Sequence, residues 1–219
     1  FARLSSAFFW PGMYASVKSH CRECPQCQRH KPKLPMSNPH LRYHHPGAAF
    51  YDVCMDLTGL FTETESSNFY ILVIQDRFTK WPEAIAIPDK QAKTVTDAFF
   101  RHFVCRHGVP RNIHMDQGTD FNNVLLDRLS ERLGMSRMST TAYHPRANGQ
   151  VERFNRTLVD SLRTYAEANP AVWDNYLESV LFAYCVSQHS GLDESPFYLV
   201  HGRDPVLLTD ILAGDPAEL

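Results

Sequence analysis

The 219-residue chain has no apolar run long enough to span a membrane, so its sequence predicts no membrane partner. It has no signal-peptide pattern, and it opens on Phe1 rather than an initiator Met, so we expect a piece of a longer polypeptide. No internal repeats are visible. Because hydrophobic residues make up 43% and aromatic residues 12%, the chain belongs to the globular class, with one substantial core and room for one small appendage.

A disulfide framework is also missing, although the chain contains six cysteines. Three are bunched and three lie in apolar stretches: Cys21, Cys24 and Cys27, then Cys54, Cys105 and Cys185. Because no secretion signal accompanies them, we expect reduced thiols in an intracellular compartment.

An excess of positive charge is likewise lacking, because the net charge is −2. Its distribution is uneven: residues 1–50 hold seven Lys or Arg against one acid, a local net of +6. The remainder holds 15 basic and 23 acidic residues, a net of −8. A basic first segment on an acidic body suits local contact with phosphates, although an ordinary solvated surface would explain the same distribution.

Apolar patterning predicts a mixed α/β layer fold. Expected strands cover residues 51–57, 69–75, 81–87, 112–115 and 135–139. Expected helices cover residues 14–20, 91–106, 122–133, 150–168 and, as the last helix, 171–187. Residues 1–30 read as a short helical unit, 31–49 as a proline-containing linker, and 142–149 as a polar loop.

Three acids stand out because two expected strands and one expected helix deliver them. Asp56 lies in an apolar strand, Asp116 follows another strand, and Glu152 comes 35 intervening residues later in a helix's first turn. Clustered carboxylates repel one another and are relieved by a divalent cation, and two metals on oxygen ligands are a device for phosphoryl transfer. Each acid also has an ordinary alternative, as a turn former, a salt-bridge partner or, for Glu152, a favourable charge at a helix N-terminus.

Other acids compete on pattern alone. Asp76 also follows a strand directly, Asp120 suits the cap of the helix expected at 122–133, and Asp127 lies within that helix. Asn155 and Arg156 fall on the same side of their helix as Glu152, which suits a face that holds metal and phosphate together.

At these positions the chain resembles the integrases of Ty3/gypsy-type LTR retrotransposons and, by extension, retroviral integrases. The matching strings occur in order over almost the whole chain: Phe9-Trp10-Pro11-Gly12-Met13, Cys24-Pro25-Gln26-Cys27-Gln28, Met55-Asp56-Leu57-Thr58-Gly59, Asp76-Arg77-Phe78-Thr79-Lys80-Trp81, Gly108-Val109-Pro110-Arg111, Asp116-Gln117-Gly118-Thr119, Thr141-Ala142-Tyr143-His144-Pro145, Asn148-Gly149-Gln150-Val151-Glu152-Arg153-Phe154-Asn155-Arg156 and Ser195-Pro196-Phe197.

The resemblance implies an RNase H-like core at residues 50–210, with a five-stranded mixed sheet flanked by helices. Residues 1–30 would be the cysteine half of an N-terminal zinc finger, and 211–219 would begin a C-terminal extension. The resemblance also implies a catalytic triad of Asp56, Asp116 and Glu152. Asp76 is then structural, either pairing with Arg77 or Lys80 or capping the turn before Trp81.

The family's zinc finger uses two histidines followed by two cysteines, and Cys24 with Cys27 match the cysteine pair. The histidines would lie upstream of Phe1, so we expect Zn²⁺ to bind only where they are present. Substitute ligands within the sequence would be Cys21, His20 or His30.

The resemblance further implies 3′-end trimming of retroelement cDNA and its joining to target DNA, with two Mg²⁺ or Mn²⁺ ions. Asp56 would bridge the ions, with Asp116 on one and Glu152 on the other. The expected partners are cDNA ends, target DNA and other copies of the chain, as a dimer or tetramer. The expected locations are the nucleus and a cytoplasmic virus-like particle.

Expected DNA contacts come from a flexible loop and from basic or amide side chains: Asn148, Gly149 and Gln150 in the loop, with Asn155, Arg156, Lys80, Arg146 and Arg153 around it. One alternative is a domesticated or inactive integrase-derived module that only binds nucleic acid or protein. Others are an RNase H or transposase of the same fold and a zinc-dependent transcription factor.

Overall fold

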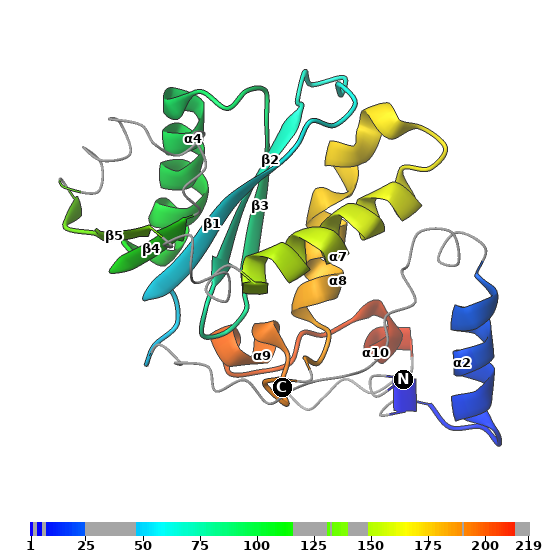
Figure 1. The fold of residues 1–219 in the computed structure, drawn as a ribbon. Coiled ribbons are helices and arrows are strands. Elements are labelled where there is room, and N and C mark those ends of the chain that lie inside the picture. Colours follow the sequence, from blue (N-terminus) through cyan, green and yellow to red (C-terminus); the bar gives the residue numbers. More distant parts are fainter. Residues whose placement is uncertain are drawn as a thin grey trace.

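A mixed sheet forms the centre of the chain (Figure 1). The computed structural model describes residues 1, 4–5, 8–24, 47–115, 131, 133–139, 149–189 and 191–212. Five strands pair in the order β3-β2-β1-β4-β5, and β1 is antiparallel to β2 but parallel to β4. Their bounds are β1 Asp52–Gly59, β2 Tyr70–Asp76, β3 Pro82–Ile87, β4 Asn112–Met115 and β5 Ser136–Ser139. The predicted mixed α/β fold is confirmed.

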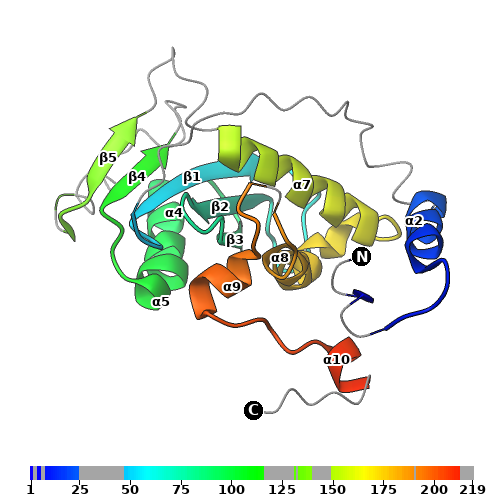
Figure 2. The same ribbon diagram turned by 90° about the horizontal axis from the view of Figure 1, so that it is seen from below.

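Helices flank the sheet on both faces (Figures 1 and 2). Their bounds are α2 Met13–Glu23, α4 Ala92–Phe99, the π-helical η1 Phe100–Val104, α5 Cys105–His107, α7 Gly149–Tyr165, the 3₁₀-helical η2 Pro170–Tyr176, α8 Leu177–Cys185, α9 Pro196–His201 and α10 Leu208–Leu212. None of the helices in the described ranges combines the length and apolar character needed to cross a bilayer.

Strict alternation along β1 and β2 divides the core into two clusters. Val53 and Met55 of β1 face α4 and η1, where they pack with Phe99 and Phe103. Cys54, between them, points to the other face because successive strand residues alternate sides. Strand β2, which lies between β3 and β1, is buried on both faces, which explains why its sequence is nearly all apolar.

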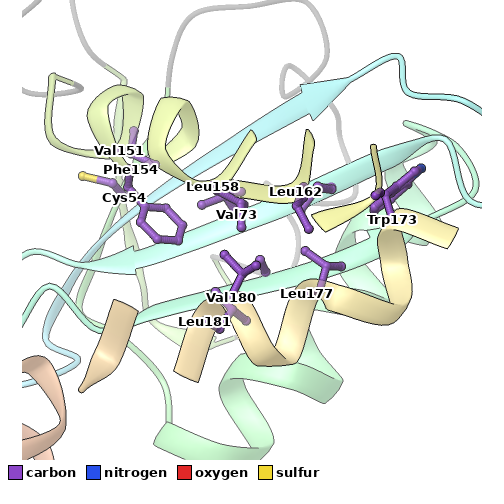
Figure 3. Close-up of a cluster of buried hydrophobic side chains, with 13 residues drawn as sticks. Cys54, Val73, Val151, Phe154, Leu158, Leu162, Trp173, Leu177, Val180 and Leu181 are labelled. Atoms are coloured by element: carbon purple, nitrogen blue, oxygen red, sulfur yellow. The ribbon is translucent and has the colours of Figure 1, made fainter. Parts of the chain in front are cut away.

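The second cluster fills the space between the sheet and the α7–α8 layer (Figure 3). Helix α7 contributes Val151, Phe154, Leu158 and Leu162, spaced three or four residues apart, so they form one buried stripe. Helix α8 and the preceding η2 add a second row of apolar side chains: Trp173, Leu177, Val180 and Leu181. This stripe determines which side of α7 faces the sheet and hence where its polar residues lie.

Two predicted helices are each divided in the structure. The segment expected at 91–106 becomes α4, η1 and α5, and the segment expected at 171–187 becomes η2 and α8. Val172 departs from helical geometry with φ −119°, which marks the kink. The apolar spacing of each segment is compatible with one regular α-helix, but in the folded chain part of each segment winds as a π-helix or a 3₁₀-helix.

The interpretation of 171–187 as the last helix is wrong, because α9 and α10 follow it. Helix α9 has local end signals, since Ser195 Oγ accepts from Tyr198 N at 3.1 Å and Gly202 closes it in the left-handed region. At six residues it is too short for a periodic signal. Helix α10 spans the predicted boundary between 210 and 211. The helix expected at 122–133 lies mostly outside the described residues.

Candidate active site

Asp56 occupies the fifth position of β1, on the face of the sheet that carries α7. Alternation with the buried Cys54 sets this direction, and the side chain of Asp56 is partly exposed. In the register, Asp56 pairs with Val73 of β2, and the preceding Met55 pairs with Met115 of β4. The predicted placement of Asp56 on a strand is therefore confirmed.

The carboxylate of Asp56 is held by two donors. Asn155 Nδ2 of α7 donates to Asp56 Oδ2 at 2.7 Å, and the backbone N–H of Leu57 donates to Oδ1 at 2.9 Å. Asn155 is only 9% exposed, because α7 packs directly on the sheet there. Hydrogen bonds to an ionised carboxylate are the stronger kind, so Asn155 fixes the orientation of Asp56.

Asn155 also presents a buried acceptor to this site. Its Oδ1 is buried and has no hydrogen-bond partner among the described residues. A buried carbonyl oxygen without a donor is costly, so its surroundings favour a group that brings a donor.

Glu152 lies in the first turn of α7, as the sequence predicts, and its side chain is exposed. It precedes Asn155 by three residues, so both side chains lie on neighbouring positions of one helix surface. The structure thus brings the helical acid to the same face of the sheet as Asp56.

Asp116 lies outside the described residues. The last described residue of β4 is Met115, whose Cα is paired with Met55 in the parallel ladder between β4 and β1. The part of Asp116 in a triad with Asp56 and Glu152 stays a prediction.

Asp76, the competing acid at the end of β2, is fully buried and caps a turn. Its Oδ2 accepts from Thr79 N at 2.7 Å and Thr79 Oγ1 at 2.6 Å, and its Oδ1 accepts from Phe50 N at 3.0 Å. Burial raises the pKa of this carboxyl, while these hydrogen bonds pull it down. Of the structural roles expected for Asp76, the structure shows the capping of the turn.

Lys80 and Gln150 contact each other, which the sequence does not predict. Lys80 Nζ donates to Gln150 Oε1 at 2.7 Å and to Arg77 O at 2.6 Å, and Gln150 Nε2 donates to Asp76 O at 3.1 Å. Burial lowers the pKa of Lys80 to about 8. Gln150 was expected both to begin the helix at 150–168 and to belong to a flexible loop with Gly149. The helix is confirmed and the loop is wrong for these two residues, because both lie in the first turn of α7.

The remaining expected DNA contacts are divided by the structure. Arg153 and Arg156 are exposed on α7 close to Glu152, where a phosphate can reach them. Asn155 is turned to Asp56 instead of to solvent. Asn148 and Arg146 lie outside the described residues.

Several polar residues near the site were missed from sequence. Gln75, fully buried at the end of β2, donates through Nε2 to Lys80 O and to Tyr184 OH, both at 3.1 Å. His114 Nε2 lies 2.9 Å from Arg77 Nη1, and burial with this cation lowers the pKa of His114. The available signal was a polar residue inside an otherwise apolar strand, which needs a buried partner.

The cysteines of the first segment are only partly described. Cys21 lies in α2, and Cys24 follows the end of that helix. Within the described ranges no cluster of three or more His, Cys, Asp or Glu side chains forms a metal site. Cys27 and His30 fall outside those ranges.

Sequence comparison identifies two family matches. Residues 48–145 match the model of the integrase core domain, and residues 1–33 match that of the integrase zinc binding domain. A retrovirus-related Pol polyprotein from transposon 412 of Drosophila melanogaster is 30% identical over 202 residues, covering 92% of this chain and 16% of the relative. Gypsy retrotransposon integrase-like protein 1 of Rattus norvegicus is 26% identical over 94% of this chain and 39% of the relative. The chain thus spans well under half the length of these relatives.

Solved structures give the same fold. A simian T-cell lymphotropic virus intasome, in complex with a PP2A regulatory subunit, has a chain that superposes with a TM-score of 0.64 at 19% identity. That match covers 88% of this chain and 69% of the other. The catalytic core domain of HTLV-2 integrase, in complex with magnesium, superposes with a TM-score of 0.57 at 17% identity, covering 73% of this chain and all of the other.

Proposed function

Because the chain belongs to the retroviral-type integrases, with an integrase core domain and an integrase zinc-binding domain, we propose that it trims the 3′ ends of retroelement cDNA and joins them to target DNA. The observation that carries this proposal is that α7, the helix with Glu152 in its first turn, packs on the sheet face of Asp56, where its Asn155 donates to Asp56. Asp116, which follows Met115 in the sequence, would complete the proposed triad.

The donor set fits a divalent cation. Asp56 is a fixed carboxylate, Glu152 is an exposed one, and both supply the oxygen ligands that Mg²⁺ and Mn²⁺ accept. Asp56, Asp116 and Glu152 would hold two such ions. When bound, the ions supply activation of the attacking oxygen and stabilisation of the leaving oxygen. Asn155 keeps the Asp56 carboxylate oriented toward that site.

DNA is the proposed substrate, contacted mainly through phosphates. Arg153 and Arg156 stand exposed on the helix that carries Glu152, so they can bind the backbone of a DNA end beside the carboxylates. Such binding weakens as salt concentration rises, because phosphate contacts release counterions.

The first segment and the assembly extend the proposal. Cys24 and Cys27 would supply two zinc ligands, with two histidines as the other pair. We place the activity in a multimer of the chain, a dimer or tetramer, on cDNA ends of a Ty3/gypsy-type LTR retrotransposon. The work would take place in the nucleus after transit from a cytoplasmic virus-like particle.

The test is metal-dependent phosphoryl transfer on a branched DNA that resembles an integration intermediate, which asks less of flanking domains than full integration. We expect resealed strands from the unmodified chain in Mg²⁺ or Mn²⁺. Asp56→Asn, Asp116→Asn and Glu152→Gln should each lower the rate by a factor of about 100 or more. Asp97→Asn, an exposed acid on α4, is the matched control and should keep full activity.

The alternative, a domesticated binding module, predicts a different pattern. A folded chain that binds DNA but reseals no strand, with equal behaviour of the unmodified chain and Glu152→Gln, would contradict the enzymatic proposal. Calorimetric titration with Mn²⁺ then shows whether the carboxylates still hold metal.

A further inference from the structure

The turn between β2 and β3, residues 76–81, is built as a rigid unit and is named here the β2–β3 turn. Asp76 N donates to Trp81 O at 2.9 Å, and Lys80 N donates back to Asp76 O at 3.1 Å. The buried carboxylate of Asp76 adds the two bonds from Thr79. A turn closed by backbone and side chain together makes a firm support for a neighbouring element.

Lys80 sits in this turn with φ +63°, in the left-handed region that glycine occupies with least strain. A lysine there costs backbone strain, which the surrounding structure has to offset. The Lys80 amine donates to Arg77 O within the turn and to Gln150 Oε1 on α7. Two of its three donors are thus directed at protein acceptors.

Gln150 returns the contact to the same turn. Its Nε2 donates to Asp76 O, so the amide of Gln150 is bonded at both ends, once from Lys80 and once to Asp76. Gln150 is the second residue of α7, two residues before Glu152. The β2–β3 turn therefore holds the helical turn from which the Glu152 side chain projects.

The opposite side of the β2–β3 turn is anchored as well. Gln75 Nε2 donates to Lys80 O and to Tyr184 OH of α8, so the backbone of Lys80 is tied to a third element. Movement of the turn would disturb β2, α7 and α8 together.

We propose that Lys80 and Gln150 are positioning residues, whose reciprocal hydrogen bonds hold the first turn of α7 and so place Glu152 opposite Asp56 for metal binding. They act through α7 and do not contact DNA phosphates. The inference rests on the proposed function for the role of Glu152, but the clamp itself is a property of the metal-free chain.

The first experiment measures amide hydrogen exchange in the metal-free chain. Lys80→Met keeps the aliphatic part of the side chain and removes its N–H donors. Gln150→Leu removes both the acceptor and the donor of the side-chain amide. Each should speed exchange across residues 149–155 about tenfold, as expected when a hydrogen bond of ordinary net strength is lost. Lys93→Met, an exposed lysine on α4, is the matched control and should change nothing there.

Two further variants separate the clamp from general loss of structure. Lys80→Gly fits the left-handed backbone, so it removes the amine with little strain and serves if Lys80→Met does not fold. Lys80→Arg keeps a cation that can donate to Gln150, and it should restore slow exchange. Unchanged exchange at 149–155 in both Lys80→Gly and Gln150→Leu would overturn the proposal.

The second experiment separates positioning from phosphate binding. In strand resealing, Lys80→Met should lower kcat between 10- and 100-fold, in the range found when the support of a metal ligand is lost, with unchanged Kd for DNA. If Lys80 instead contacted a phosphate, Lys80→Met would raise the Kd for DNA and leave kcat unchanged. The slope of log affinity against log salt concentration would become smaller by about one. That second pattern would overturn the positioning role.

The double variant Lys80→Met/Gln150→Leu completes the cycle. If the two side chains act as one pair, the double variant should be no slower than the worse single variant, since each change already breaks the contact. If the rate losses of the two single variants multiplied in the double variant, Lys80 and Gln150 would act independently, which would contradict the proposed pair. Full activity of Glu152→Gln would overturn the proposed function, while the exchange result would still stand for the clamp.

Discussion

The two faces of the central sheet differ in what they bury. Beneath α4 and η1, β1 and β2 contribute an apolar row packed on Phe99 and Phe103, which ends at the buried carboxylate of Asp76. Beneath α7, the same two strands contribute apolar side chains and also the polar Asp56 and Gln75. Asn155 and Gln150 of α7 and Lys80 of the β2–β3 turn add further polar groups there. The first face serves stability, and the second also sets the geometry of carboxylates.

The polar face tolerates this because most of its buried groups have partners. Asp56 has Asn155, Gln75 has Tyr184, and Lys80 has Gln150. Two carbonyl oxygens on this face, Gln75 Oε1 and Asn155 Oδ1, have no partner among the described residues. A face with unfilled acceptors is less favourable for folding than an apolar one, and such compromises are typical of functional sites.

The largest expected effect on folding is on the apolar face. Phe99 is fully buried and stacks on Phe103 with ring centroids 5.6 Å apart. Phe99→Ala should lower the free energy of unfolding by about 3–5 kcal/mol, because it removes packing and leaves a cavity. Phe100→Ala, the adjacent residue at 42% exposure, should cost much less. Chemical denaturation measures both, and equal losses would contradict the assignment of faces.

A smaller loss is expected where the polar turn begins. Asp76→Asn replaces one of two carboxylate oxygens with a donor, although both oxygens accept hydrogen bonds. We expect the free energy of unfolding to fall by about 1–3 kcal/mol, since a buried donor then lacks its acceptor. Asp97→Asn is the control for denaturation. A more stable Asp76→Asn would mean that relief from burying the charge exceeds the lost bonds.

On the polar face, stability and site geometry should separate. Asn155→Leu removes the donor to Asp56 but keeps side-chain volume, so we expect a loss of only about 1 kcal/mol in unfolding free energy. Mn²⁺ affinity should fall about tenfold, because Asp56 loses its orientation. Thr157→Ala, exposed on the same helix, should leave both unchanged. Calorimetric titration measures the affinity for Mn²⁺. If Asn155→Leu left this affinity unchanged, Asn155 would have a packing role and would not orient Asp56.

The last expected effect is a pH dependence at Lys80. Its pKa of about 8 in the folded chain lies below the ordinary 10.5, because burial disfavours the charged amine. Between these values the unfolded chain binds more protons, so stability relative to Lys80→Met should rise as pH increases from about 8 to about 10.5. Urea unfolding at both ends of this window measures the difference. A constant difference between the two proteins would contradict a buried amine.

Much of the fold is readable from local pattern. The run at 69–75 predicted strand β2 within one residue of Tyr70–Asp76, and 112–115 matches β4. The first succeeds because a strand buried on two faces is mostly apolar. The divided helices at 91–106 and 171–187 were not predictable, since a regular helix satisfies the same apolar spacing and only packing selects π or 3₁₀ winding.

The site divides in the same way. Sequence pattern and family resemblance named Asp56 and Glu152, and the alternation of β1 with the stripe of α7 explains why both lie on one face. The same reasoning named Lys80 and Gln150 as separate DNA contacts, which stays a prediction, and did not pair them with each other. Their mutual bond joins residues 70 positions apart, and no local pattern encodes such a pair.

By itself, the sequence determined the strands, the amphipathic faces and the acids available for chemistry, because alternation and helical spacing are properties of neighbouring residues. The tertiary structure alone decided which polar side chains meet across the sheet: Asn155 with Asp56, and Lys80 with Gln150. Burial makes an unpaired polar group costly, so these distant partners are selected only when the helices close over the sheet.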